Sequence, residues 1–339
     1  MDDRGRSRTA AGDAPMTRAR IATVCQNEEY YPTIEENRAH ILHLLDLALA
    51  QRPDLVCLPE TFTTAGVLGP EANLAEPVPG PTTDLIAKRA REHHSYVICP
   101  IKTQRDGIHW NSAILIGRQG EIVGIYDKVH PVTTSADYTV MENGLRPGSD
   151  PPVFDLDFGR IGIQICFDAG FPETWQMLAN KGARLIFWPS AYNGGFPLQV
   201  YAYLHHVYVV SSVAQESSRI IDPLGRILAA TDPHVNVIVR DINPDFCVCH
   251  YDFNYSIPDL IMAQYGDRVT IRSDFDSGHF LVEPNDDAIT IAHLQQEFGF
   301  ESTGLYHQRH RDAYTLLREG KTSPPQTALH GNRPEYAKW

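Results

Sequence analysis

Apolar runs and amphipathic stretches alternate along the first two thirds of the chain. Residues 21–25 and 55–58 are short, continuous apolar runs, which predict buried strands. The stretch between them, 33–50, carries apolar side chains at the spacing of one helix face, namely Ile41, Leu44, Leu45, Ala48 and Leu49. This order predicts a β-α-β unit.

The same pattern continues to about residue 240. It predicts helices at 82–93 and 172–181 and strands at 96–100, 112–116, 122–126, 160–166, 184–188, 207–212, 219–221, 227–230 and 235–240. Apolar-run strands and hairpin strands interleaved with helices predict an α/β fold whose sheets are covered on their outer faces.

The character of the chain changes at both ends. Residues 1–17 are small, polar and rich in arginine, which predicts a flexible lead-in. Beyond residue 244 the chain is polar and aromatic, with helical stretches predicted at 289–298 and 308–319 and no second core of domain size. We therefore expect a main domain at 18–244 and a C-terminal extension at 245–339 that packs on the body or on a partner subunit.

Composition narrows the class of partner. The 339 residues are 42% hydrophobic and 21% charged, as in a globular protein, and the net charge of −13 argues against nucleic acid or an anionic membrane as a partner. No apolar run approaches the roughly 18 residues of a membrane span, and no signal-peptide core is present. We expect a cytoplasmic protein with a small-molecule substrate.

The six cysteines lack the paired spacings of a zinc site or a secreted disulfide scaffold. One cluster, Cys247-Val-Cys249-His250, contains three ligand-type side chains, but a metal site there is not favoured. We expect neither a metal nor an organic cofactor.

Three segments place a reactive side chain just past an apolar strand, where α/β folds commonly present their sites. The segments are 55–60, 125–131 and 159–173. Their reactive side chains are Glu60, Lys128 within Tyr-Asp-Lys-Val-His-Pro, and Cys166 within Cys-Phe-Asp-Ala-Gly-Phe-Pro-Glu. Each residue alone has an ordinary structural interpretation, as a loop carboxylate, a surface cation or a core thiol. Their combination carries the functional signal.

Together these segments resemble the nitrilase, or carbon–nitrogen hydrolase, superfamily over about residues 20–241. The motifs are Pro-Glu, Tyr-x-Lys-x-His, Cys-x-Asp-x-x-x-Pro-Glu and the downstream Trp-Pro-Ser-Ala-Tyr segment. The resemblance implies a four-layer α-β-β-α sandwich, a homodimer or higher homo-oligomer, and a Glu-Lys-Cys triad. In that triad Glu60 would be the general base, Lys128 the cation at the oxyanion and Cys166 the nucleophile.

The chemistry of these residue types agrees with those roles. A thiol with an ordinary pKa of about 8.5 is mostly protonated at pH 7, so a nucleophilic cysteine needs a neighbouring base or cation. Attack on an amide carbon develops an oxyanion that the Lys128 ammonium and the backbone N–H of Phe167 can stabilise.

Four further residues are candidates. Glu142 corresponds to the place where many family members carry another glutamate, and this functional interpretation is favoured over the alternative of a solvated turn acid before Gly144. His130 is expected near Lys128, with a packing role favoured over a substrate contact. Tyr192 and Asn193 either line the substrate pocket or serve only the loop.

The residues after the nucleophile bear on the substrate. Nitrilases proper resemble Cys-Trp-Glu at this point, whereas Cys-Phe-Asp resembles the amidase and N-carbamoyl amide hydrolase branches. Family members that act on carboxylate-bearing substrates commonly place an arginine here, but this chain has Ala169 and Gly170. Neutral amides are therefore expected to be preferred unless Arg146, Arg219 or another residue supplies a cation.

We predict a metal-independent thiol hydrolase of an amide or N-carbamoyl (ureido) amide that forms a Cys acyl-enzyme and releases ammonia or an amine. A nitrilase acting on a small nitrile is the first alternative. A catalytically silent homologue that binds a partner is the second.

Overall fold

The computed structural model describes residues 18–324, so the predicted lead-in 1–17 lies outside the described residues. Its first sheet has seven strands in the order β13-β1-β2-β4-β5-β6, with β3 pairing beside β4. These strands are β1 (Ala19–Val24), β2 (Leu55–Cys57), β3 (Glu76–Pro77), β4 (Tyr96–Arg105), β5 (Ile108–Ile116), β6 (Ile122–Asp127) and β13 (Val237–Ile242).

The second sheet has six strands in the order β12-β11-β10-β9-β8-β7. They are β7 (Val153–Leu156), β8 (Gly159–Ile163), β9 (Leu185–Ser190), β10 (Tyr208–Val213), β11 (Arg219–Ile221) and β12 (Ile227–Ala230). In both sheets the central strands pair in parallel: β2 lies between β1 and β4 in one sheet, and β9 lies between β8 and β10 in the other. Parallel strands buried on both faces account for the continuous apolar runs in the sequence.

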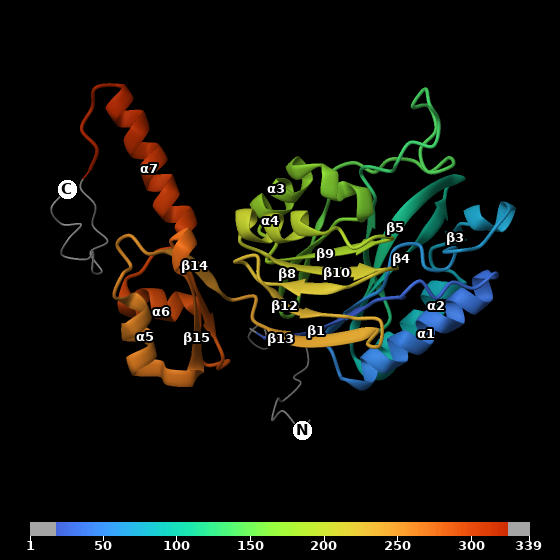
Figure 1. Cartoon of the computed structure of the whole chain (residues 1–339), viewed down its shortest axis with the longest axis horizontal. Coiled ribbons are helices and arrows are strands. Elements are labelled where there is room, and N and C mark those ends of the chain that lie inside the picture. Colours follow the sequence, from blue (N-terminus) through green and yellow to red (C-terminus); the bar gives the residue numbers. More distant parts are fainter. Residues whose placement is uncertain (1–17, 325–339) are drawn as a thin grey trace.

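Helices cover the outer face of each sheet, as Figure 1 shows. The first sheet packs against α1 (Ile34–Ala50) and α2 (Pro81–His93), and the second against α3 (Pro172–Asn180) and α4 (Phe196–His205). A third apolar cluster, which includes Ile98, Leu115, Ile161 and Phe187, fills the space between the sheets. The predicted α-β-β-α sandwich is thereby confirmed.

Local chemistry accounts for the edges of these elements. The Thr33 hydroxyl caps α1 by accepting a hydrogen bond from the Glu36 backbone N–H at 3.2 Å, and Glu35 and Glu36 favour the positive helix N-terminus. The helix begins one residue later than predicted. Helix α4 escaped prediction because its aromatic, proline-containing sequence has no clear helical period.

The chain beyond residue 246 forms a third sheet, which corrects the expectation that no second core exists there. Its strands are β14 (Cys247–His250), β15 (Val269–Asp274) and β16 (His279–Pro284), and its helices are α5 (Ile257–Tyr265), α6 (Ile291–Phe298) and α7 (Thr303–Arg318). These elements enclose an apolar cluster of their own that includes Phe280, Val282 and Leu294. The strands were overlooked because their apolar runs are short, three residues in β16 and interrupted by polar residues in β15.

This C-terminal unit contacts the sandwich through both polar and apolar side chains. Asn243 Nδ2 donates to the Pro284 carbonyl at 2.8 Å. Val248 and Leu281 of the unit belong to the apolar cluster between the two sheets of the sandwich. Helix α7 extends away from both parts in Figure 1 and buries only Thr303. No helix within residues 18–324 is long and apolar enough to cross a bilayer.

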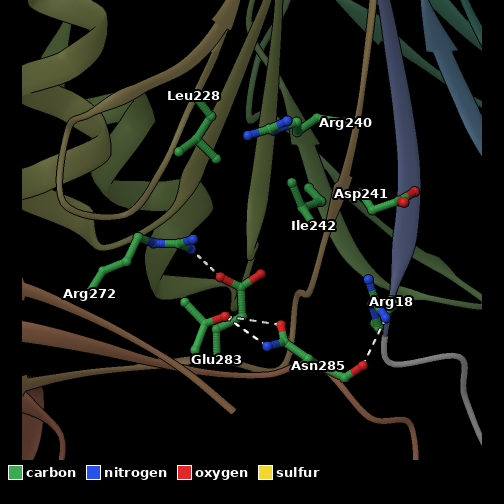
Figure 2. A pocket seen from close by; sticks show the side chains of 9 residues that line it. Arg18, Leu228, Arg240, Asp241, Ile242, Arg272, Glu283 and Asn285 are labelled. Atoms are coloured by element: carbon green, nitrogen blue, oxygen red, sulfur yellow. Dashed lines mark hydrogen bonds and ion pairs between the residues drawn. The ribbon is translucent and has the colours of Figure 1, made fainter. Parts of the chain in front are cut away.

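A polar cavity of about 220 Å³ lies where the C-terminal unit meets the edge of the sandwich (Figure 2). Arg272 of β15 pairs there with Glu283 of β16, and Arg18 Nη1 donates to the Asn285 carbonyl at 2.8 Å. The cavity is lined by elements that do not carry the candidate residues of the sequence.

Candidate active site

The three principal candidates come from three strand ends and two sheets. Glu60 follows β2 and Lys128 follows β6, both in the first sheet, whereas Cys166 follows β8 in the second. Lys128 Nζ lies 2.9 Å from Glu60 Oε1, and the Cys166 thiol is in electrostatic contact with both side chains. The structure therefore brings the three residues together.

Lys128 is held by two carboxylates. Its Nζ lies 2.5 Å from Glu142 Oε1 as well as 2.9 Å from Glu60, and the lysine is buried. Burial alone would lower the pKa of Lys128, but the charges of Glu60, Cys166 and Glu142 outweigh it and raise that pKa above its ordinary value. Lys128 is therefore a fixed ammonium at neutral pH.

Glu142 reaches the site from the exposed loop between β6 and β7. Its carboxylate accepts from the Val132 backbone N–H at 3.1 Å and from Asn111 Nδ2 at 3.0 Å, in addition to Lys128. The Glu142 side chain therefore lies beside Lys128 and Asn111 and is not a turn acid directed only to solvent.

Asn111 on β5 was missed by the sequence interpretation. Its Nδ2 donates to Glu60 Oε1 at 2.8 Å as well as to Glu142, so one amide orients both carboxylates. The Ala191 backbone N–H donates to the other Glu60 oxygen at 3.0 Å. The signal in the sequence was a polar residue on the same strand face as the apolar residues Ala113 and Leu115.

Burial keeps the Cys166 thiol protonated. It raises the pKa of Cys166 to about 12, and the neighbouring Glu60 charge acts in the same direction, whereas Lys128 and a hydrogen bond with Ser190 oppose it. A thiol of this kind becomes a nucleophile when a base takes its proton during attack. Glu60, in side-chain contact with the thiol, is in position to be that base.

The backbone at Cys166 is left-handed, with φ +48°, a conformation that L-residues rarely adopt. Cys166 begins a short 3₁₀ helix, η2 (Cys166–Gly170), after two residues that follow the end of β8. The Trp188 indole Nε1 donates to the Cys166 carbonyl at 3.0 Å and holds the turn from β9.

Asp168 links the turn that carries Cys166 to the segment that carries Lys128. Its buried carboxylate accepts from the Ile165 backbone N–H at 2.8 Å, from the Tyr126 hydroxyl at 2.6 Å and from the His130 backbone N–H at 3.0 Å. Buried carboxylates require several donors of this kind. Asp168 is therefore a structural centre of the site.

The structure gives His130 a packing position. Its Nδ1 lies 2.8 Å from Asp168 Oδ1, and its ring stacks on Phe171 with centroids 3.7 Å apart. Phe167 packs edge-on against the Phe171 ring, and the Phe167 side chain is exposed. Both contacts agree with the packing role expected for His130.

Tyr192 and Asn193 differ in their surroundings. Tyr192 packs edge-on against Trp188, and its pKa is raised by burial and by the nearby Cys166 and Glu60 charges, which places its ring beside the site. The Asn193 side chain bonds to Glu216 and to the Gly195 backbone N–H. These contacts lie within the loop region and agree with the loop alternative for Asn193.

Arg146 and Arg219, the two arginines considered as anchors for a substrate carboxylate, have their described contacts with residues other than the three principal candidates. The Arg146 guanidinium lies over the Trp110 ring, 5.9 Å from its centroid, and Arg219 lies in β11 opposite Ala230.

A partly buried thiol, a base and a fixed ammonium in one place are suited to acyl transfer through a covalent intermediate. The chain belongs to the carbon–nitrogen hydrolase family, whose sequence profile, described as Carbon-nitrogen hydrolase, matches residues 21–248. The protein is therefore an enzyme of the nitrilase superfamily, as the motifs predicted.

Curated relatives and solved structures agree with this assignment. The deaminated glutathione amidase of Synechocystis sp. is 28% identical over 241 residues, covering 63% of this chain and 88% of the relative. Omega-amidase NIT2-B of Xenopus laevis is 27% identical over 233 residues, covering 62% and 84%. Saccharomyces cerevisiae Nit3, a member of the nitrilase superfamily, superposes with a TM-score of 0.59 at 20% identity, covering 75% of this chain and 97% of Nit3.

Proposed function

We propose that this enzyme hydrolyses the C–N bond of an amide or N-carbamoyl amide through an acyl-enzyme on Cys166. The observation that carries the proposal is the buried Lys128 ammonium, which two carboxylates fix beside the thiol. Glu60 acts as the general base, Lys128 as the cation at the oxyanion and Cys166 as the nucleophile.

In the first half-reaction the thiol proton passes to Glu60 while Sγ forms a bond to the carbonyl carbon. The carbonyl π electrons move to oxygen, and the resulting oxyanion is stabilised by Lys128 and by the backbone N–H of Phe167, each donor contributing about 3 to 4 kcal/mol in comparable hydrolases. Glu60 then returns the proton to the nitrogen, the C–N bond breaks, and ammonia or an amine leaves.

The second half-reaction hydrolyses the thioester. Glu60 takes a proton from water as the oxygen attacks the acyl carbon, and the same cation stabilises the second oxyanion. Collapse breaks the C–S bond, the thiolate regains the proton from Glu60, and the acid product leaves. The Glu142 carboxylate positions Lys128 throughout without exchanging a proton with the substrate.

Amides are favoured over nitriles for two reasons. The Cys-Phe-Asp sequence at the nucleophile resembles the amidase branches, and the deaminated glutathione amidase and omega-amidase relatives are amidases by name. The nitrile alternative requires the same thiol but would consume two water molecules per ammonia released.

The test is a panel of primary amides, N-carbamoyl amino acids and small nitriles, assayed for ammonia with wild-type protein and with Cys166→Ala. Release of ammonia or amine from an amide or ureide that disappears in Cys166→Ala is the expected result. Turnover of nitriles only would establish the nitrilase alternative. Absence of turnover across the panel would favour the silent, partner-binding homologue.

We also propose that residues 18–244 are the catalytic domain, that residues 245–339 form an appendage and that the protein is a homo-oligomer. Helix α7 supports this, because it carries the exposed apolar side chains Leu305, Tyr314 and Leu317 although it buries only Thr303. Exposed apolar side chains gathered on one helix favour association.

A further inference from the structure

A second lysine lies beside the candidate catalytic carboxylates. Lys102 of β4 is paired with Asn111 of β5, and the Lys128 backbone N–H donates to the Asn111 carbonyl at 2.8 Å. Residues directly opposite on paired strands point to the same face of a sheet. The side chains of Lys102, Asn111 and Lys128 therefore form one row across three neighbouring segments.

The row faces the second sheet. Side chains alternate along a strand, so Lys102 shares a face with Ile98, and Asn111 shares a face with Ala113 and Leu115. Those apolar residues lie in the cluster between the sheets. The Lys102 side chain therefore lies on the sheet face that is directed toward the second sheet, at the end of the sheet where Glu60 and Cys166 meet.

Charge is unbalanced without Lys102. Glu60 and Glu142 contribute two negative charges, and Lys128 contributes one positive charge. Lys102 is half-buried and within electrostatic reach of both carboxylates, whose charges partly offset the lowering of its pKa by burial. With Lys102 as an ammonium, the four groups sum to zero.

We propose that Lys102 is a positioning residue of this site, whose ammonium offsets the surplus negative charge of Glu60 and Glu142 and so admits acyl substrates that carry a carboxylate. The claim about carboxylate-bearing substrates rests on the proposed function. The claim that Lys102 offsets the charge of the two carboxylates does not. The role proposed for Lys102 replaces the expectation that neutral amides are preferred, because that expectation required Lys128 to be the lone cation near the acyl site.

The effect of Lys102 depends on the low polarity of its partly buried surroundings. In a partly buried site, charges interact several times more strongly than in water, and salt screens them less. An anionic group that approaches Cys166 meets the field of every neighbouring charge, including Glu60, Glu142, Lys128, Lys102 and the Tyr192 phenol if ionised. Removing Lys102 leaves a net negative site that repels such a group.

A pair of alkylating reagents measures this field without knowledge of the substrate. Iodoacetamide is neutral and iodoacetate is anionic, and both transfer a two-carbon group to a thiol sulfur with loss of iodide. Second-order rates of Cys166 alkylation at pH 7.5, followed by peptide mass spectrometry, give the iodoacetate-to-iodoacetamide rate ratio for each variant. In Lys102→Met and Lys102→Gln we expect this ratio to fall by about fivefold or more.

Control variants separate charge from shape. Lys102→Arg keeps the charge and is expected to recover most of the wild-type ratio. Lys88→Met removes an exposed lysine of α2 and is expected to leave it unchanged. If Lys102→Met fails to fold in thermal melts, Lys102→Gln carries the test. A ratio within twofold of wild type in a folded Lys102 variant without the charge would overturn the proposal.

Turnover supplies the second readout. Butyramide and succinamate differ by a terminal methyl group against a carboxylate, and Lys102→Met is expected to lose about fivefold more kcat/KM on succinamate than on butyramide. Equal losses on both amides would overturn the substrate part of the proposal. A changed alkylation ratio in an enzyme that hydrolyses no amide would instead refute the proposed function while leaving the electrostatic role in place.

Discussion

The Trp188 indole donates a 3.0 Å hydrogen bond to the carbonyl oxygen of Cys166, the residue whose backbone is held at φ +48°. Trp188 is fully buried within β9, so a strand of the second sheet fixes the turn that presents the thiol. A left-handed residue persists only where its surroundings determine it, and this contact is one of the determinants.

Removal of this hydrogen bond tests that relationship. In Trp188→Phe we expect kcat to fall by about tenfold or more, since a small displacement of the thiol is costly in rate. The lost bond and the smaller ring should also cost about 1 to 3 kcal/mol of unfolding free energy. Steady-state kinetics and urea unfolding measure the two effects. An unchanged kcat in a folded variant would show that the Trp188 indole does not position the Cys166 thiol.

Substitution of the proposed nucleophile should abolish activity without unfolding. Cys166→Ala and Cys166→Ser are expected to retain the fold, because the thiol is only partly buried, and to lose nearly all turnover. Cys99→Ala, at a fully buried thiol in the layer between the first sheet and its helices, is the matched control and should stay active. Activity above a few per cent in Cys166→Ala would require another nucleophile.

Glu60→Gln and Lys128→Met should both collapse kcat but differ in stability. Lys128→Met leaves two neighbouring carboxylates without their cation, and breaking a buried pair costs about 3 to 5 kcal/mol. In Glu60→Gln the pair of Lys128 with Glu142 remains, so a smaller loss is expected. Unfolding free energies and kcat at saturating substrate check both parts, and wild-type kcat in either variant would exclude that residue from the mechanism.

The alkylation of Cys166 should depend on pH over an unusually wide range. Because the pKa is raised to about 12, the thiolate fraction is small at pH 7 and grows about tenfold per pH unit up to that value. The iodoacetamide rate is therefore expected to rise from pH 6.5 to pH 9.5 without a plateau. A plateau near neutral pH would indicate a resting thiolate paired with Lys128.

Association of the chain can be measured directly. Light scattering at micromolar concentration is expected to give a particle of at least twice the 38.0 kDa of one chain. Leu317→Glu on α7, with Glu319→Gln as a surface control near the end of the same helix, should weaken the assembly if this helix lies in the interface. A 38.0 kDa particle for the wild-type protein would refute the oligomer.

Much of this molecule could be predicted from its sequence because apolar periodicity and local motifs report on neighbours along the chain. The bounds of α1, to within one residue, and the positions of Glu60, Lys128 and Cys166 after strands follow from such signals. Asn111 and Lys102 did not, since their importance arises from pairing between β4 and β5 and from carboxylates that approach from other segments. The sheet of β14 to β16 likewise depends on long-range pairing of short strands.

The placement of the candidate residues on different sheets has a consequence for unfolding. Glu60 and Lys128 belong to one half of the sandwich and Cys166 to the other, so the proposed proton acceptor and the proposed nucleophile meet only across the apolar layer that joins the halves. Slight loosening of that layer separates them while each sheet keeps its hydrogen bonds. Catalysis is thus a more sensitive gauge of contact between the halves than circular dichroism, and under mild denaturant activity should disappear first.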